Sequence, residues 1–204
     1  MDRKEHWDRI YATTESMELS WHQHTPTLAL DLIKRAGLGA AADIIDVGGG
    51  DATLVDYLLA QGAAHVTVLD VSAVAIARAR ARLGARASAV TWIEADVTQA
   101  ALPARRFDVW HDRAVFHFLT DAQDQKRYVD VARRALKRGG HLIVATFATD
   151  APSCCSGLDL VRYSPDALRG AFSDGFDLVT HGGSVHQTPA GIQQQFSYCC
   201  LRRQ

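Results

Sequence analysis

A run of glycines behind an aspartate is the segment of this sequence whose residue types are best suited to bind a ligand. Asp46 lies near the end of an apolar run of strand length, and the glycines at 48–50 follow it. A helical pattern begins directly after them, which predicts a strand, a tight turn and a helix. Because glycine lacks a Cβ atom, such a turn can lie against a bound molecule, and the first N–H groups of the helix stay free to donate to it.

A second aspartate indicates which kind of ligand this turn would bind. Asp70 ends the apolar run at 65–69, at about the distance where nucleotide-binding α/β units place the acid that binds ribose. A nicotinamide fingerprint requires glycine or alanine at position 53, where this chain has Thr53. The spacing is instead Asp-x-Gly-x-Gly-x-Ala, from Asp46 to Ala52. A nicotinamide enzyme is therefore disfavoured.

This spacing resembles the first motif of the class I S-adenosylmethionine-dependent methyltransferases. The resemblance implies that S-adenosyl-L-methionine is the cofactor and that the following residues bind it: Asp46, Gly48, Gly50, Asp70, Val71, Asp96 and Val97. In this assignment Asp70 binds the ribose hydroxyls, Asp96 binds the adenine amino group, and the backbone N–H of Val97 donates to the ring.

The positions of the remaining elements predict an α/β fold. Apolar runs predict strands, and patterns with helical spacing between them predict helices. The strands are expected at 43–47, 65–69, 89–93, 107–111, 141–147, 176–180 and 195–201, and the helices at 4–12, 52–61, 72–83, 120–137 and 164–172. The last two strands are joined by a link so short that they must be antiparallel neighbours. The expected fold is Rossmann-like, a mostly parallel sheet with helices on both faces and a C-terminal antiparallel hairpin.

The residues before the first strand are predicted to cover the cofactor. The chain is expected to form a single methyltransferase domain over 1–204, with a helical lid at 1–37 and a cofactor-binding core at 43–204. Trp21 lies in the lid, and an aromatic face is well suited to contact a cationic sulfonium. Ordinary packing in the core is the alternative role for this side chain.

The segment 112–119 is predicted to form the active-site turn, because ionisable side chains lie among aromatic ones at a strand end. Methyl transfer is an in-line displacement, and a thiol acceptor needs little acid–base help, whereas an amine or hydroxyl needs a base. Asp112 is the first candidate for that base, and His117 or His111 the second; His111 is also a candidate for cofactor binding. The alternatives are a salt bridge between Asp112 and Arg113 and a His117 that bonds only to backbone.

Two stretches resemble the thiopurine and thiol methyltransferases and their bacterial relatives. They are Trp7-Asp-Arg followed by Trp21-His22-Gln23, and Trp110-His111-Asp112-Arg113-Ala114. The second departs from the Trp-Asp-Arg-Gly pattern of that branch by an inserted histidine and by alanine in place of glycine. The resemblance implies a small-molecule acceptor, preferentially a thiol or another soft nucleophile.

Three other functions remain as alternatives. Trp7, Asp8 and Tyr11 are similar to the first helix of some protein-lysine methyltransferases, and a regulator that binds the cofactor without turnover is the second alternative. Because the sequence contains both histidines and cysteines, a soft metalloid is the third alternative, as the methyl acceptor. Neighbouring residues of a strand face opposite ways, so Cys199 and Cys200 cannot both point into one site, and a role as small apolar residues is preferred.

Composition limits the partners and the compartment. The 204 residues are 48% hydrophobic and carry a net charge of −1, which favours one well-buried domain and disfavours nucleic acid and anionic membranes. The first residues are charged, and no apolar run is long enough to span a bilayer, so we expect no secretion signal, no membrane partner and a cytoplasmic location. The four cysteines form two adjacent pairs without metal-site spacing, so no metal is expected. The expected state is a monomer or homodimer.

Overall fold

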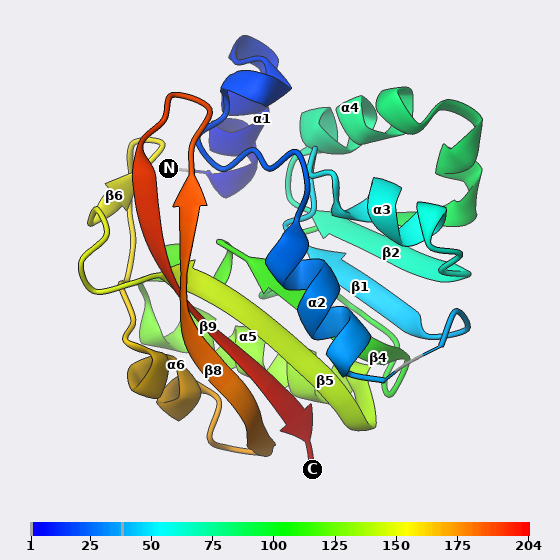
Figure 1. Cartoon of the computed structure of the whole chain (residues 1–204), viewed down its shortest axis with the longest axis vertical. Coiled ribbons are helices and arrows are strands. Elements are labelled where there is room, and N and C mark those ends of the chain that lie inside the picture. Colours follow the sequence, from blue (N-terminus) through cyan, green and yellow to red (C-terminus); the bar gives the residue numbers. More distant parts are fainter. Residues whose placement is uncertain (1, 38) are drawn as a thin grey trace.

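A seven-stranded sheet runs through the protein, seen in a computed structural model that describes residues 2–37 and 39–204 (Figure 1). Its strand order is β3-β2-β1-β4-β5-β9-β8. The strands are β1 (Asp43–Val47), β2 (His65–Asp70), β3 (Val90–Glu94), β4 (Phe107–Arg113), β5 (Leu136–Phe147), β8 (Phe176–Gln187) and β9 (Gln193–Arg203). The first five pair in parallel, and β9 joins antiparallel to both β5 and β8. The predicted mostly parallel sheet with a C-terminal antiparallel hairpin is confirmed.

Helices cover both faces of this sheet. They are α1 (Arg3–Thr13), α2 (Thr27–Arg35), α3 (Leu54–Ala60), α4 (Ala73–Leu83), α5 (Ala122–Ala135) and α6 (Pro165–Ala171). One apolar core joins the sheet to α5 and α6, and a second joins it to α2 and α3. The strand β1 is buried along its whole length, which agrees with its apolar sequence and its central place. None of the helices in the described part of the chain has both the length and the apolar character that a bilayer crossing requires.

The boundaries of the fifth helix and the strand after it differ from those expected. The helix was predicted over 120–137 and begins instead after Asp121, whose carboxylate accepts from the backbone N–H groups of Gln123 and Asp124. It ends at Ala135, and β5 begins at Leu136, five residues before the predicted strand. Leu136 already pairs with Phe107 of β4, and the pairing resumes at His141 after a register shift, with Gly139 at a φ of 76° between them.

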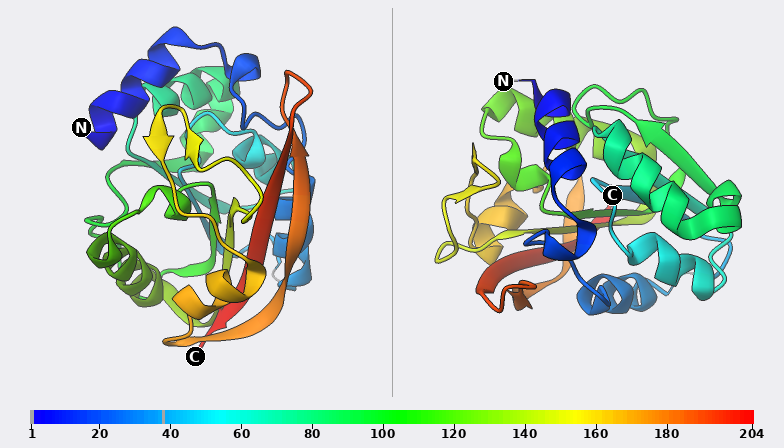
Figure 2. Two further views of the ribbon diagram at one scale, coloured as in Figure 1. Left: turned by 90° about the vertical axis from the view of Figure 1, so that its left-hand side faces the viewer. Right: turned by 90° about the horizontal axis from the view of Figure 1, so that it is seen from above.

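The N-terminal segment lies across the carboxyl ends of the parallel strands (Figure 2). Arg3 in α1 forms ion pairs with Asp96 and Asp124, and the Asp8 carboxylate accepts from the Ser72 hydroxyl at 2.7 Å. Aromatic residues of this segment pack together against α4, among them Trp7, Tyr11 and Trp21. These contacts hold α1 over the carboxyl ends of the parallel strands.

A short hairpin lies near the same end of the sheet as α1 (Figure 1). Its strands are β6 (Cys154–Cys155) and β7 (Leu158–Asp159), which pair with each other and not with the main sheet. The sequence predicts a loop in this region, and the structure has a hairpin instead. Together with α1, the hairpin covers the carboxyl ends of the strands.

Candidate active site

Two adjoining cavities open at the carboxyl ends of the parallel strands, the edge where open α/β sheets bind ligands. The large cavity has a volume of about 380 Å³ and the small cavity about 60 Å³. Five residues line both: Tyr11, Trp21, Val47, Gly48 and Arg113. The large cavity is within the size range of small-molecule sites, and the shared residues show that the small cavity lies directly beside it.

The predicted site residues fall into three groups by position. The large cavity is lined by Asp70, Val71, Asp96, Val97 and His117; the small cavity by Asp46 and His111; and both by Trp21 and Gly48. Gly50 and Asp112 line neither cavity. Most of these residues therefore gather at one place although they are spread over almost a hundred positions of the sequence.

The glycine turn passes close to the residues around it. Gly48 has a φ of 66°, and a Cβ atom there would collide with the Val115 side chain. Gly50 has a φ of 37°, and its Cβ would lie 2.8 Å from Asp70 Oδ2. Gly48 lines both cavities, whereas Gly50 lets the turn approach the Asp70 carboxylate and lines neither cavity.

One end of the large cavity carries carboxylates, and we call it the carboxylate sector: residues 69–71 and 95–97. Asp70 is buried and accepts from the Ser72 backbone N–H at 2.8 Å. Burial raises the pKa of Asp70 to about 7, and the nearby charge of Asp46 acts in the same direction. Burial alone would also raise the pKa of Asp96, but hydrogen bonds from Thr98 and Arg3 outweigh it, so that pKa is lowered. Asp96 is thus ionised and already bound to α1.

The other end of the large cavity is lined by aromatic rings, and we call it the aromatic sector: His117, Phe118, Phe147 and Phe196. Phe147 contacts both His117 and Phe196, with ring centroids 5.0 Å apart in each pair. Cys155 and Leu158 of the β6–β7 hairpin also line the cavity. The sector is therefore an enclosed, largely apolar space beside the glycine turn.

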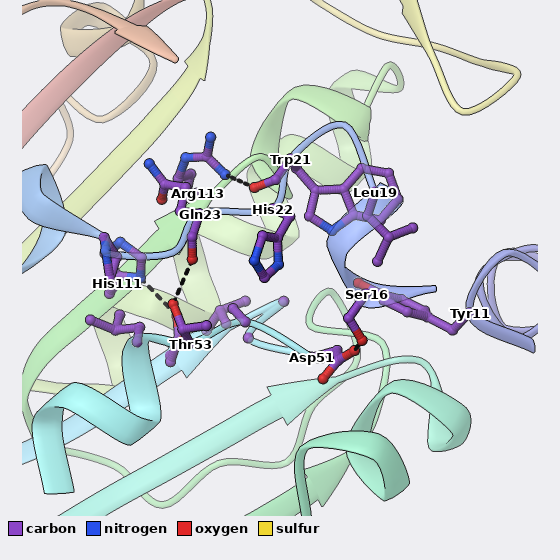
Figure 3. Close-up of a pocket in the computed structure, with 17 residues that line it drawn as sticks. Tyr11, Ser16, Leu19, Trp21, His22, Gln23, Asp51, Thr53, His111 and Arg113 are labelled. Atoms are coloured by element: carbon purple, nitrogen blue, oxygen red, sulfur yellow. Dashed lines mark hydrogen bonds and ion pairs between the residues drawn. The ribbon is translucent and has the colours of Figure 1, made fainter. Parts of the chain in front are cut away.

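In the small cavity, His111, labelled in Figure 3, forms a hydrogen bond with Asp46. The two residues are register partners on β4 and β1, and the Nδ1 of His111 lies 2.7 Å from Asp46 Oδ1. A carboxylate oxygen accepts in this bond, so Nδ1 of His111 carries a proton, and in a ring with a single proton Nε2 keeps its lone pair. His111 is thus the imidazole at this site whose free nitrogen can accept a proton or a donor.

His117 in the large cavity has the opposite arrangement. Its Nδ1 accepts from the backbone N–H of Phe147 at 3.1 Å, so the proton of the neutral ring is on Nε2. Burial lowers the pKa of His117 to about 3, helped by the positive charge of Arg113, and the ring stays neutral at physiological pH. Its Nε2 is buried and has no hydrogen-bond partner within the described residues. His117 therefore offers a donor, which does not fit the predicted role as a base.

Arg113 stands between the two cavities at the end of β4. Its guanidinium lies 4.7 Å from the centroid of the Phe196 ring, and its Nη1 donates to the Trp21 carbonyl at 3.0 Å (Figure 3). Its Nη2 is buried without a partner, and no carboxylate forms an ion pair with it among residues 2–37 and 39–204. Burial lowers the pKa of Arg113 to about 10, so the side chain is still charged at neutral pH.

Asp112 does not fit the predicted role of a general base. Its side chain is fully buried, faces neither cavity, and accepts from the Tyr128 hydroxyl at 2.5 Å and from the backbone N–H groups of Val115 and Phe116. Burial raises its pKa to about 6. The alternative salt bridge to Arg113 is not formed either. Asp112 shapes the turn after β4, and because Tyr128 lies sixteen residues further on, in α5, no local motif indicated this partner.

The adjacent cysteines of β9 lie away from both cavities. Cys199 and Cys200 are buried, and burial raises their pKa values to about 12 and about 11. Cys155, in the β6–β7 hairpin, is the cysteine that lines the large cavity. The buried positions of Cys199 and Cys200 agree with the preferred role as small apolar residues, whereas the approach of Cys155 to the cavity depends on the fold of the hairpin.

Comparisons with known proteins agree with this geometry. Residues 44–140 match a protein family described as a methyltransferase domain. A search against curated proteins gives no significant match. The matched residues contain the glycine turn, Asp70, Asp96 and the turn after β4, which are the elements that form the cavities.

Solved structures with the same fold cover nearly the whole chain. One, from a study of the conversion of a disulfide bond into a thioacetal group during echinomycin biosynthesis, has a TM-score of 0.81 at 20% identity, covering 99% of this chain and 92% of its own. A SAM-dependent methyltransferase from Anabaena variabilis has a TM-score of 0.77 at 15% identity, with 100% and 96% covered. The N-methyltransferase NodS from Bradyrhizobium japonicum, in complex with S-adenosyl-L-homocysteine, has a TM-score of 0.74 at 20% identity, with 98% and 97% covered.

Residues 44–140 are thus similar to a methyltransferase domain, and the whole chain has the fold of S-adenosylmethionine-dependent methyltransferases. At these identities the solved structures establish the fold and leave the acceptor open.

Proposed function

We propose that this protein transfers a methyl group from S-adenosylmethionine to a small-molecule acceptor with a soft nucleophile, preferentially a thiol. The observation that carries the proposal is the division of the large cavity. A carboxylate sector suited to a nucleoside and an enclosed aromatic sector without a base meet at Gly48 and Trp21.

The residues present fit the cofactor. Gly48 lines both cavities with backbone alone, and the carboxylate of Asp70 lines the large cavity, where it can accept from ribose hydroxyls. Asp96 and the backbone of Val97 are placed to bind the adenine, and the small cavity with Asp46 and His111 is placed for the amino-acid end. When bound, S-adenosylmethionine supplies an activated methyl group on a cationic sulfonium. Trp21, which lines both cavities, gives that cation an aromatic neighbour.

The aromatic sector favours an acceptor that is a good nucleophile without assistance. The Nε2 of His117 is a donor, and the Asp112 carboxylate is sealed behind Tyr128. No residue identified in this sector can therefore remove a proton from an amine or alcohol, whereas a thiol, with a pKa of about 8.5, is partly ionised at neutral pH. Catalysis then rests on holding the acceptor in line and excluding water, which α1 and the β6–β7 hairpin accomplish.

Two alternatives have less support from the site. A protein-lysine acceptor calls for an open, acidic groove, but the aromatic sector is covered by two elements and contains the cation of Arg113. A regulator without turnover has no need of an enclosed space beside the glycine turn. The soft-metalloid acceptor loses its main support because Cys199 and Cys200 lie outside both cavities.

The first experiment is a calorimetric titration of the protein with S-adenosylhomocysteine, with NADH as the control. We expect binding of S-adenosylhomocysteine alone. Absence of binding would overturn the cofactor site proposed here. Radiolabelled methyl transfer to a panel of small thiols, amines and alcohols then tests the acceptor class. Turnover of amines or alcohols in preference to every thiol would contradict the soft-nucleophile proposal, and saturable cofactor binding without turnover of any class would favour the regulator.

A further inference from the structure

We propose that the acceptor carries a carboxylate, and that Arg113 and His117 bind it in the aromatic sector of the large cavity. This inference rests on the proposed function and adds a chemical class to it. It starts from two buried hydrogen-bond donors that find no acceptor among residues 2–37 and 39–204, Nη2 of Arg113 and Nε2 of His117.

An unpaired buried cation is costly, and folded proteins rarely retain one without a use. The other arginines that contact buried acids form ion pairs, such as Arg82 with Asp51 and Arg106 with Asp43. Arg113 instead donates from Nη1 to the neutral Trp21 carbonyl, and its guanidinium lies over the Phe196 ring. Within the described residues no anion neutralises it, so the charge is available to a ligand in the cavity that it lines.

The second donor belongs to the same part of the cavity. His117 packs against Phe147, and Phe147 packs against the Phe196 ring that carries the Arg113 guanidinium. The positive charge of Arg113 contributes to the low pKa of His117, which places the two groups within electrostatic reach of each other. His117 therefore stays neutral and adds a hydrogen bond without a second charge.

One fixed charge and one neutral donor select a small monoanion. A carboxylate accepts from a guanidinium and, on its remaining lone pairs, from an imidazole N–H. A phosphate dianion would leave one negative charge uncompensated in an apolar space. The acids lining the cavity do not compete: Asp70 and Asp96 belong to the carboxylate sector, and Asp159 is exposed on β7. The proposed acceptor is thus a small thiol with a carboxylate.

The carboxylate of the cofactor could also bind Arg113, because Arg113 lines the small cavity as well. His117 decides between them, since it lines the large cavity only. In addition, the Arg113 nitrogen that points toward the lid is already occupied by the Trp21 carbonyl (Figure 3). The large cavity is the one that both residues line, which favours the aromatic sector over the amino-acid end of the cofactor site.

The test compares 3-mercaptopropionate with 3-mercaptopropionamide, which has nearly the same shape and no charge. Each is titrated into the protein saturated with S-adenosylhomocysteine, and each is assayed as a methyl acceptor. We expect the carboxylate to bind at least tenfold more tightly than the amide. In Arg113→Gln this preference should fall below twofold, and in His117→Phe it should fall severalfold, while the affinity for S-adenosylhomocysteine changes by less than twofold in both. Arg138→Gln, at an exposed arginine, is the control and should behave as wild type.

Three outcomes would overturn the inference. Equal affinity for the two probes in the wild-type protein would show that no carboxylate site exists. A preference that survives in Arg113→Gln would place the site elsewhere. A loss of S-adenosylhomocysteine affinity in Arg113→Gln as large as the loss for the acceptor would assign Arg113 to the carboxylate of the cofactor. Failure of the proposed function looks different, because S-adenosylhomocysteine would then not bind to the wild-type protein at all.

Discussion

The two sectors of the large cavity carry opposite chemistry within one continuous space. The carboxylate sector presents acceptors, with Asp70 and Asp96 at the ends of neighbouring strands. The aromatic sector presents donors, with Arg113 and His117 among phenylalanine rings. A ligand with hydroxyl and amino groups matches the first and an anion matches the second. This difference supports the proposal that the site binds two ligands. The cofactor would occupy the carboxylate sector, the acceptor the aromatic sector, and the methyl group would lie where the two sectors meet.

The two histidines make the same contrast at the level of single atoms. A carboxylate partner leaves Nε2 of His111 as an acceptor, and a backbone N–H partner leaves Nε2 of His117 as a donor. Identical side chains therefore have different chemistry because their Nδ1 atoms have different partners. The sequence alone gives both residues the same candidate role, since neither partner is local.

The largest effect should come from the carboxylate sector. We expect Asp70→Ala to weaken the binding of S-adenosylhomocysteine by about 100-fold, because two charge-assisted hydrogen bonds to ribose hydroxyls are lost. Asp159→Ala, at an exposed acid that lines the same cavity, should change the affinity by less than twofold. Isothermal titration calorimetry measures both. Wild-type affinity in Asp70→Ala would remove the carboxylate sector from the cofactor site.

The next effect tests whether Asp112 is structural. Asp112→Asn should reduce the free energy of unfolding by about 1–2 kcal/mol, because the buried hydrogen bond from Tyr128 is weakened. Tyr128→Phe removes this bond and also the bond that the Trp110 indole N–H donates to the hydroxyl, so it should cost at least as much. Urea unfolding gives both values, and turnover per folded molecule should stay within about threefold of wild type. A loss of turnover by several hundredfold in a stable Asp112→Asn protein would restore Asp112 as a base.

The cofactor half of the site was largely predictable from the sequence. The glycine turn, Asp70 and Asp96 each follow a strand whose apolar run is clear, and parallel strands bring their carboxyl ends together. The lining of the large and small cavities agrees with eight of the nine residues assigned to the cofactor, with Gly50 as the exception.

The acceptor half was not predictable, because it depends on contacts between distant parts of the chain. Phe147 and Phe196 reach the cavity from β5 and the C-terminal strand β9, and Cys155 from a hairpin whose strands are two residues long. No spacing rule connects such residues. The sequence identifies Arg113 as a possible partner of Asp112. That Arg113 forms no ion pair within the described residues can be seen only from the positions of the surrounding acids.

A smaller effect should appear in the pH dependence of cofactor binding. In the free protein, burial raises the pKa of Asp70 to about 7, so its carboxyl is mostly protonated at pH 6 and mostly ionised at pH 8. Ribose hydroxyls donate to the ionised form, so the affinity for S-adenosylhomocysteine should rise by up to about tenfold between these values. The stability of the free protein should change in the other sense: the folded state holds this proton more tightly, so the contribution of Asp70 is present below about pH 4 and is lost as the pH rises through about 7.

Asp70→Asn is the control for this pH effect. The amide does not titrate, so its affinity, although lower, should be nearly constant between pH 6 and pH 8. Calorimetry at several pH values in buffers of different ionisation enthalpy also counts the protons released on binding. A wild-type profile as flat as that of Asp70→Asn would mean that the charge of Asp70 does not face the cofactor.

The smallest effect should separate the two kinds of cysteine. Cys199 is buried in β9, away from both cavities, and its thiol lies 3.5 Å from the Pro165 carbonyl, a bond that a serine hydroxyl can replace. Turnover of Cys199→Ser should therefore stay within about twofold of wild type. Cys155→Ser alters the wall of the large cavity and should change the KM for the acceptor severalfold while the affinity for S-adenosylhomocysteine is kept. A severe loss of turnover in Cys199→Ser, at unchanged stability, would show that the buried thiol takes part in the reaction. It would also favour the metalloid acceptor.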